Sequence, residues 1–123
     1  MLNPLQLAFM GDSVHALLVR TRLMEKDLPV KAMHQAATAS ICAVAQHQAL
    51  ARIMPFLTPE EMDIVRRGRN AHAHHSAPRS ASVGQYAGAT GLEALLGFLY
   101  LVGDRERLEE VFRLTEEAPA ATE

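Results

Sequence analysis

The sequence predicts an all-α protein with one domain, and three observations lead to this prediction. Apolar residues recur at helical spacing along most of the 123-residue chain. Residues that favour helix starts and helix ends divide this pattern into segments. No segment alternates polar and apolar residues as a half-buried strand would. With 49% hydrophobic residues, a chain of this length can bury one compact core.

The first half of the chain is expected to form two long helices. The first begins at Pro4, with Asn3 as its cap, and ends near Met24. After a break that contains a proline, an alanine-rich helix is predicted over residues 31–54.

The next helix has a strong start signal. Thr58 is the expected cap, Pro59 occupies the first helical position, and two glutamates follow in the first turn. This helix is expected to fade near Gly68. Residues 71–82 are then expected to form a flexible loop.

The helix predicted over residues 83–102 is apolar on nearly every side, and so is the first helix. A helix that is hydrophobic all round must be covered all round. In a domain of five helices this requires a central position or a partner subunit, so a two-fold homodimer is predicted. Asp104 is expected to cap a last, amphipathic helix that ends near Glu117.

Composition narrows the class of protein. The formal net charge of −2 excludes a generally basic nucleic-acid coat. The single cysteine, Cys42, has apolar neighbours, which suggests a buried thiol in a reducing compartment. No signal sequence or membrane-spanning run is apparent, so a cytoplasmic protein without a membrane partner is expected. One domain is expected over residues 1–117, with a flexible tail over residues 118–123.

A basic segment lies within this slightly acidic protein. No acidic residue occurs between Asp63 and Glu93, whereas four arginines and three histidines do. Such a segment is typical of a surface that contacts a polyanion. Chance clustering on a solvated loop is the alternative.

Two carboxylates interrupt the apolar helices. Asp12 follows Gly11 in the first helix, and Glu93 lies near the middle of the later apolar helix. Neither has a lysine or arginine three or four positions away, and a buried, unpaired carboxylate is costly. A divalent cation shared by both acids would compensate them, and Gly11 and Gly97 would let the two helices approach closely. Oxygen ligands without cysteine favour Mg²⁺ over zinc.

Arrangements without a shared cation also remain open for the two acids. Asp12 could pair locally with His15, and Glu93 could face solvent. The cluster of His72, His74 and His75 could suggest a transition-metal site, although such a loop is more often a polar loop or a phosphate contact.

Two segments resemble the signature helices of the ribonuclease III catalytic domain: LAFMGDSV at residues 7–14 and GLEALLGFLYLVG at residues 91–103. RRGRNA lies between them and is followed by Pro78 and Arg79. The order of these motifs is most similar to the Mini-ribonuclease III subfamily, which has no double-stranded-RNA-binding domain. The resemblance extends over residues 2–108.

The resemblance implies a ribonuclease III-like helical bundle that acts as a homodimer. It implies an Mg²⁺-dependent endoribonuclease, with Mn²⁺ as a substitute, that cuts double-stranded RNA and leaves a 5′-phosphate and a 3′-hydroxyl. The implied substrate is the stem formed by the ends of precursor large-subunit (23S) ribosomal RNA. Whether a ribosomal protein takes part is left open. The family's catalytic and metal-binding carboxylates carry over to Asp12 and Glu93.

The resemblance also locates the RNA contacts and shows departures from the full-length enzymes. Those enzymes carry further acids where this chain has Leu5 and Thr90, which argues against a second tightly held metal. Histidines replace the basic residues expected after RGRNA, so RNA contact there would depend on pH. The candidate RNA-binding residues are Arg66, Arg67, Arg69, Asn70, His72 and Arg79.

Two other function classes remain open. A non-catalytic, duplex-RNA-binding dimer in ribosome assembly would need the basic segment but not carboxylates beside phosphates. A helical protein-interaction module would use the apolar helices, and would show neither metal-dependent cleavage nor salt-sensitive RNA binding. The few aromatic residues argue against a single-strand binder.

Overall fold

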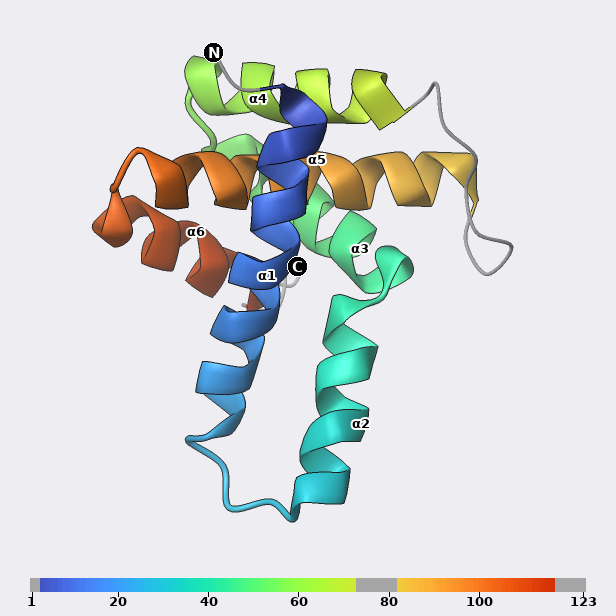
Figure 1. Cartoon of the computed structure of the whole chain (residues 1–123), viewed down its shortest axis with the longest axis vertical. Coiled ribbons are helices and arrows are strands. Elements are labelled where there is room, and N and C mark those ends of the chain that lie inside the picture. The colour runs from blue at the N-terminus through green and yellow to red at the C-terminus, as the bar shows by residue number, and fades with distance from the viewer. Residues whose placement is uncertain (1–2, 73–81, 117–123) are drawn as a thin grey trace.

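The structure is a computed structural model, and it describes residues 3–72 and 82–116. These residues form helices and no strand, which confirms the all-α prediction (Figure 1). The helices in chain order are α1 (Pro4–Leu23), α2 (Val30–Ile41), α3 (Ala43–Ile53), the short 3₁₀ helix η1 (Met54–Phe56), α4 (Pro59–His72), α5 (Val83–Leu101) and α6 (Arg105–Glu116).

Three helices begin where the capping residues predict. The side chain of Asn3 accepts a hydrogen bond from the amide of Leu5 at 2.7 Å at the start of α1. At the start of α4, the Thr58 hydroxyl accepts from the Glu61 amide at 3.1 Å, and the Glu61 carboxylate accepts from the Thr58 amide at 2.9 Å. At the start of α6, the Asp104 carboxylate accepts from the Arg107 amide. These bonds satisfy amides that the helices themselves leave without partners.

The prediction of one continuous helix over residues 31–54 is wrong. The chain breaks at Cys42, whose ψ of 157° is extended, so that α2 ends at Ile41 and α3 begins at Ala43. Figure 1 shows that α2 and α3 run in different directions; α2 packs beside α1, and α3 packs on α5. No proline or glycine marks this break in the sequence. The break arises because α2 and α3 pack against two different helices, and this packing overrides the local helix propensity. Cys42 is exposed, so the expected buried thiol is also wrong.

Helix α4 is longer than the sequence predicts, since it continues through Gly68 to His72. A Cβ atom on Gly68 would lie 3.1 Å from the Cα of Gly91 on α5. Gly68 is therefore a packing residue of α4 rather than a terminator. The rest of the expected loop, residues 73–81, and the expected tail, residues 118–123, lie outside the described residues.

Helix α5 is the centre of the fold. It contacts α1, α3, α4 and α6, and in Figure 1 α4 runs alongside it while α1 crosses it. Leu92, Leu95 and Leu96 of α5 have no exposed surface. Of the two alternatives that the sequence left for this apolar helix, a central position or a partner subunit, the structure shows the central position. No helix in the described part of the chain is both long and apolar enough to span a membrane.

Two glycines set the distance between α1 and α5. A Cβ on Gly11 would lie 1.6 Å from the carbonyl oxygen of Glu93, and a Cβ on Gly97 would lie 2.0 Å from the carbonyl oxygen of Leu7. Each glycine thus lies directly against the backbone of the other helix, where no side chain fits. This confirms the predicted close approach at Gly11 and Gly97.

Helix α1 leaves one apolar face uncovered within the described chain. Phe9, Leu17 and Met24 are 79%, 65% and 71% exposed. They are eight and seven residues apart, which places them on one side of the helix. Leu17 and Met24 also line a groove of about 330 Å³ between α1 and α2, together with Val30 at the start of α2. The apolar surface therefore continues from α1 onto α2.

Gly97→Ala is expected to lower the free energy of unfolding by about 3 kcal/mol, because the added methyl group forces the α1 and α5 backbones apart. Urea denaturation followed by circular dichroism measures this change. Gly84→Ala is the matched control on the same helix, since only Ser82 Oγ, at 4.0 Å, lies near the added Cβ. The control should gain about 0.5–1 kcal/mol. Equal effects of the two substitutions would contradict the close crossing.

Candidate active site

The crossing of α1 and α5 brings Asp12 and Glu93 together. Gly11 lies on the carbonyl group of Glu93, so the side chain of the next residue, Asp12, emerges beside the Glu93 side chain. Their carboxyl groups are within hydrogen-bonding reach of each other. Asp12 is exposed and Glu93 is half-buried, so the pair lies at the edge of the core. The alternative in which Glu93 simply faces solvent is therefore wrong.

The proximity of the two carboxyl groups changes the acidity of Glu93. Burial raises the pKa of Glu93 to about 8, and the negative charge of Asp12 adds to this shift. Two neighbouring carboxylates repel each other, and the repulsion is stronger in a partly desolvated environment. Near neutral pH, and without a cation, Glu93 therefore retains its proton.

Gln46 of α3 forms the inner wall of this site. Its Nε2 donates to Glu93 Oε2 at 3.3 Å and makes a second hydrogen bond, of 3.0 Å, with His15 Nδ1. Gln46 is 2% exposed and His15 is 3% exposed. The motifs of the sequence do not identify Gln46 as a site residue. It lies 47 residues from Glu93, and no local pattern connects the two positions.

His15 has a different partner from the one that local spacing suggests. Its Nδ1 faces Gln46, and its ring packs edge-on against Phe112 with the ring centroids 6.0 Å apart. Burial lowers the pKa of His15 to about 4, although the charge of Asp12 acts in the opposite direction. His15 is therefore neutral at pH 7. A neutral ring that accepts at Nδ1 carries its proton on Nε2.

The two carboxyl groups fit a divalent cation. None of the described lysines or arginines forms an ion pair with Asp12 or Glu93. In the described residues, no third histidine, cysteine or acid completes a metal-binding cluster with them. A hard cation such as Mg²⁺ accepts carboxylate oxygens and fills its remaining positions with water or substrate oxygens. The donor set therefore suits a cation that is held openly rather than enclosed by protein.

The candidate RNA-binding residues lie on the second half of α4 and beyond it. Arg66 is exposed and pairs with Asp63, and Asn70 is exposed as well. Arg69 is half-buried, and a Cβ on Gly91 would lie 2.9 Å from its Cγ.

The basic second half of α4 lies close to the helix that carries Glu93. Arg69 reaches the turn of α5 that precedes Glu93, so α4 carries its positive charges beside the helix that carries the acid. Arg67 is half-buried on the same helix, and His72 is its last residue. Arg79, His74 and His75 lie outside the described residues.

The class of the protein is an all-helical nuclease domain, because the family whose domain matches this helical fold is a ribonuclease family. The Ribonuclease III domain matches residues 5–104, which is most of the chain. The chain belongs to the ribonuclease III family, and it is an endoribonuclease of the Mini-ribonuclease 3 type. Members of this family act on double-stranded RNA and generally depend on a metal ion.

Similar proteins support this assignment along nearly the whole chain. Mini-ribonuclease 3 of Symbiobacterium thermophilum is 48% identical, over 91% of this chain and 86% of that protein. Mini-ribonuclease 3 of Thermoanaerobacter sp. is 44% identical, over 93% and 80%. The crystal structure of a Fusobacterium nucleatum protein superimposes with a TM-score of 0.83 at 28% identity, covering 91% of this chain and 89% of that one.

The raised pKa of Glu93 predicts how stability depends on pH when EDTA removes metal ions. The folded protein keeps the Glu93 proton up to about pH 8, whereas the unfolded chain releases it near the ordinary pKa of 4.5. Between these values the folded state binds more protons, so this contribution to stability falls as pH rises. Glu93→Gln removes the titration. Its unfolding free energy should exceed the parent's by a margin that grows with pH and levels off above about pH 8, at on the order of 2 kcal/mol after allowance for partial exposure.

Urea denaturation between about pH 5 and pH 9 measures this margin. His15 is present in both proteins, so its own titration cancels in the comparison. Glu109→Gln, at an exposed position of α6, is the control and should follow the parent at every pH. A margin for Glu93→Gln that stays constant with pH would contradict a raised Glu93 pKa.

Proposed function

We propose that this endoribonuclease uses Asp12 and Glu93 to hold Mg²⁺, or Mn²⁺ in its place, while it cuts double-stranded RNA. The observation that supports this proposal is the carboxyl pair of exposed Asp12 and half-buried Glu93, which has no cationic side chain as a partner in the described chain. A carboxyl pair in which Glu93 otherwise keeps its proton gains most from a divalent cation. Pure RNA binding would not benefit from two acids in this position, because they repel phosphates.

The protein's own groups prepare this site for phosphodiester hydrolysis. Asp12 and Glu93 supply the negative charge, and Glu93 gives up its proton when a cation is held, so affinity for metal should increase up to about pH 8. A bound cation supplies an activated water and neutralises charge on the reacting phosphate. Each cut leaves a 5′-phosphate and a 3′-hydroxyl.

Positive residues of α4 are proposed to hold the RNA backbone. Arg66 and Asn70 are exposed, and the ion pair between Arg66 and Asp63 is a surface pair that costs little to break. Arg67, Arg69, His72 and Arg79 complete the proposed contact surface. Contacts of this kind read the shape and the phosphates of an A-form duplex rather than its sequence.

A second copy of the chain is proposed to cover the apolar face formed by Phe9, Leu17 and Met24. Large exposed apolar side chains on one helix face are typical of an interface. A two-fold dimer brings the same face of each copy together. Asp12 is on the same helix as this face, so the dimer would carry two sites, one for each RNA strand.

The proposed natural substrate is the stem formed by the ends of precursor 23S ribosomal RNA, cut in the cytoplasm. This part of the proposal depends on the subfamily to which the chain belongs. A ribosomal protein that remodels the RNA is proposed as a further partner. The competing functions are a non-catalytic RNA-binding dimer and a protein-interaction module, and assays of cleavage, RNA binding and sedimentation distinguish them.

Asp12→Asn is expected to slow Mg²⁺-dependent cleavage of a duplex RNA by about 100-fold or more, because it removes one of two proposed metal ligands. Folding, dimerisation and duplex binding should stay at the parent level. Asp27→Asn, at an exposed position between α1 and α2, is the matched control and should cut normally. An Asp12→Asn protein that cuts as fast as the parent would falsify the proposed site. A parent that binds duplex RNA without cutting it would favour the non-catalytic dimer.

Arg66→Ala combined with Arg67→Ala is expected to weaken the binding of duplex RNA, which Asp12→Asn should leave unchanged. Affinity for duplex RNA should fall, and the slope of log affinity against log salt should decrease by about two, one for each lost phosphate contact. Arg105→Ala combined with Arg113→Ala removes the same charge from exposed positions of α6 and should change neither quantity. Parent-level binding by the Arg66 and Arg67 variant at moderate salt would exclude this surface.

Phe9→Asp is expected to weaken dimerisation by about 100-fold or more, because it places a charge at the most exposed apolar residue of the proposed interface. Sedimentation velocity over a concentration series measures this effect. Phe56→Asp, at an exposed position of η1, is the control and should leave the dimer intact. A parent protein that sediments as a monomer at all concentrations would rule out the dimer.

A further inference from the structure

We propose that Gln46 is a positioning residue that orients the Glu93 carboxylate as an uncharged hydrogen-bond donor. This inference rests on the proposed metal-binding role of Asp12 and Glu93, and it adds the group that sets the geometry of one ligand. Nothing in the motifs of the sequence assigns a role to this glutamine.

The hydrogen bonds of Gln46 define the orientation of Glu93. One amide nitrogen reaches both Glu93 Oε2, at 3.3 Å, and His15 Nδ1, at 3.0 Å. An amide nitrogen has two hydrogens, one for each of these acceptors. Because Oε2 accepts from Gln46, the carboxylate is held in one orientation, and Oε1 is left for the proposed cation.

The absence of charge on Gln46 is as important as its donor group. A lysine or arginine at this position would also donate to Glu93, but it would form an ion pair and offset the negative charge that attracts a cation. A buried apolar residue would leave Oε2 without a donor on the core side. A glutamine orients the carboxylate and leaves the net charge of the Asp12–Glu93 pair unchanged.

The architecture explains how Gln46 reaches a site built by two other helices. The extended backbone at Cys42 separates α3 from α2, so that α3 can lie on α5 near Glu93. The backbone N–H of Gln46 donates to the backbone carbonyl oxygen of Cys42 at 3.0 Å, which places Gln46 in the first turn after the break. A helix that continued straight from α2 would follow α1 instead.

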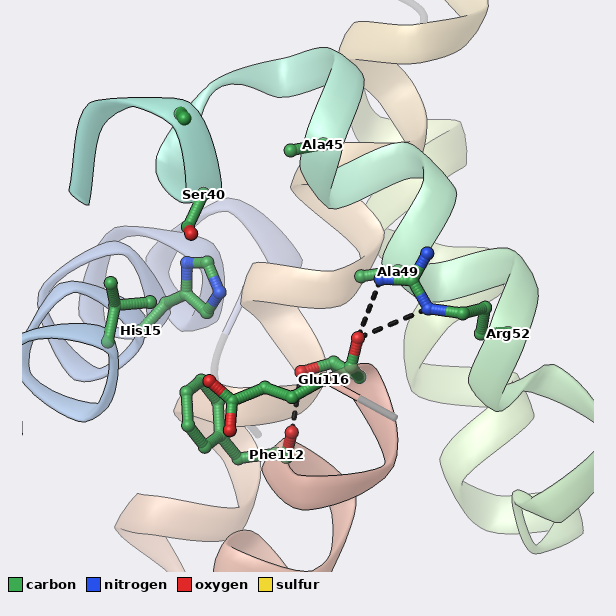
Figure 2. A pocket seen from close by; sticks show the side chains of 10 residues that line it. His15, Ser40, Ala45, Ala49, Arg52, Phe112 and Glu116 are labelled. Atoms are coloured by element: carbon green, nitrogen blue, oxygen red, sulfur yellow. Dashed lines mark hydrogen bonds between the residues drawn. The ribbon is translucent and has the colours of Figure 1, made fainter. Parts of the chain in front are cut away.

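His15 accepts the second hydrogen of the Gln46 side-chain amide and so fixes the orientation of that amide. Its neutral ring accepts at Nδ1, and a ring protonated there could not accept the second amide hydrogen. Figure 2 shows the imidazole at the wall of a pocket of about 300 Å³, between Ser40 and Phe112. The chain His15–Gln46–Glu93 therefore runs from this pocket to the carboxyl pair. Outer hydrogen bonds of this kind commonly tune metal affinity by about 10-fold to 100-fold.

Mn²⁺ binding to the metal-free protein tests this inference without depending on cleavage. The loss of the electron paramagnetic resonance signal of free Mn²⁺ measures how much is bound. Gln46→Met keeps the length of the side chain but removes the donor, and should weaken Mn²⁺ binding by about 10-fold or more. Gln46→Lys restores a donor with a positive charge and should bind Mn²⁺ more weakly still. Gln48→Met, at an exposed position of α3, is the matched control and should bind like the parent.

The acceptor on His15 provides a second test that leaves Gln46 in place. His15→Asn keeps an acceptor close to the Nδ1 position and should bind Mn²⁺ nearly as well as the parent. His15→Leu removes the acceptor and should bind several-fold more weakly. If Gln46→Met does not fold, the two His15 variants decide whether Gln46 positions Glu93. Equal Mn²⁺ binding by these two variants would overturn the inference.

Glu93→Gln separates this inference from the proposed function. Weak Mn²⁺ binding by Glu93→Gln, together with parent-level binding by Gln46→Met, would leave the metal site intact and refute the positioning role. Parent-level binding by Glu93→Gln would refute the metal site itself. A merely structural Gln46 would lower the unfolding free energy of Gln46→Met and leave its Mn²⁺ affinity unchanged.

Discussion

The contact between the backbones of α1 and α5 is the constraint on which the rest of the structure depends. Gly11 and Gly97 each occupy a place where a Cβ would overlap a carbonyl oxygen of the other helix. This contact lets α1 lie directly on the central helix. It also sets Asp12 next to Glu93, so the same packing that closes the core builds the candidate active site.

The energetic cost of placing the Asp12 and Glu93 carboxyl groups side by side explains the chemistry of the site. Glu93 is partly removed from water and lies beside a second acid, so its pKa rises to about 8 and the metal-free pair retains a proton. A tightly packed carboxyl pair is unfavourable for folding and favourable for holding a cation. Gln46 satisfies one oxygen of Glu93 without offsetting this charge. At Glu93, stability therefore opposes the proposed metal-binding role, as is common at active sites.

Burial is distributed unevenly between the two apolar helices. The middle of α5, from Gly88 to Gly97, is largely enclosed by its neighbours, whereas α1 covers α5 with one face and exposes Phe9, Leu17 and Met24 on another. The basic half of α4 packs on α5 from a further direction. One chain thus presents an apolar surface, a carboxyl pair and the basic second half of α4 on three connected helices. This arrangement suits the proposed dimer and its proposed duplex substrate.

The sequence by itself determined the helical class, the helix starts at Asn3, Thr58 and Asp104, and the glycines of the crossing. These features depend on local capping and on patterns within one helix, which the order of residues encodes directly. The break at Cys42, the continuation of α4 through Gly68 and the hydrogen bonds of Gln46 were decided only by the tertiary structure. Each of them depends on contacts between helices that are distant in the chain, and such contacts can override local propensity without leaving a pattern in the residues nearby.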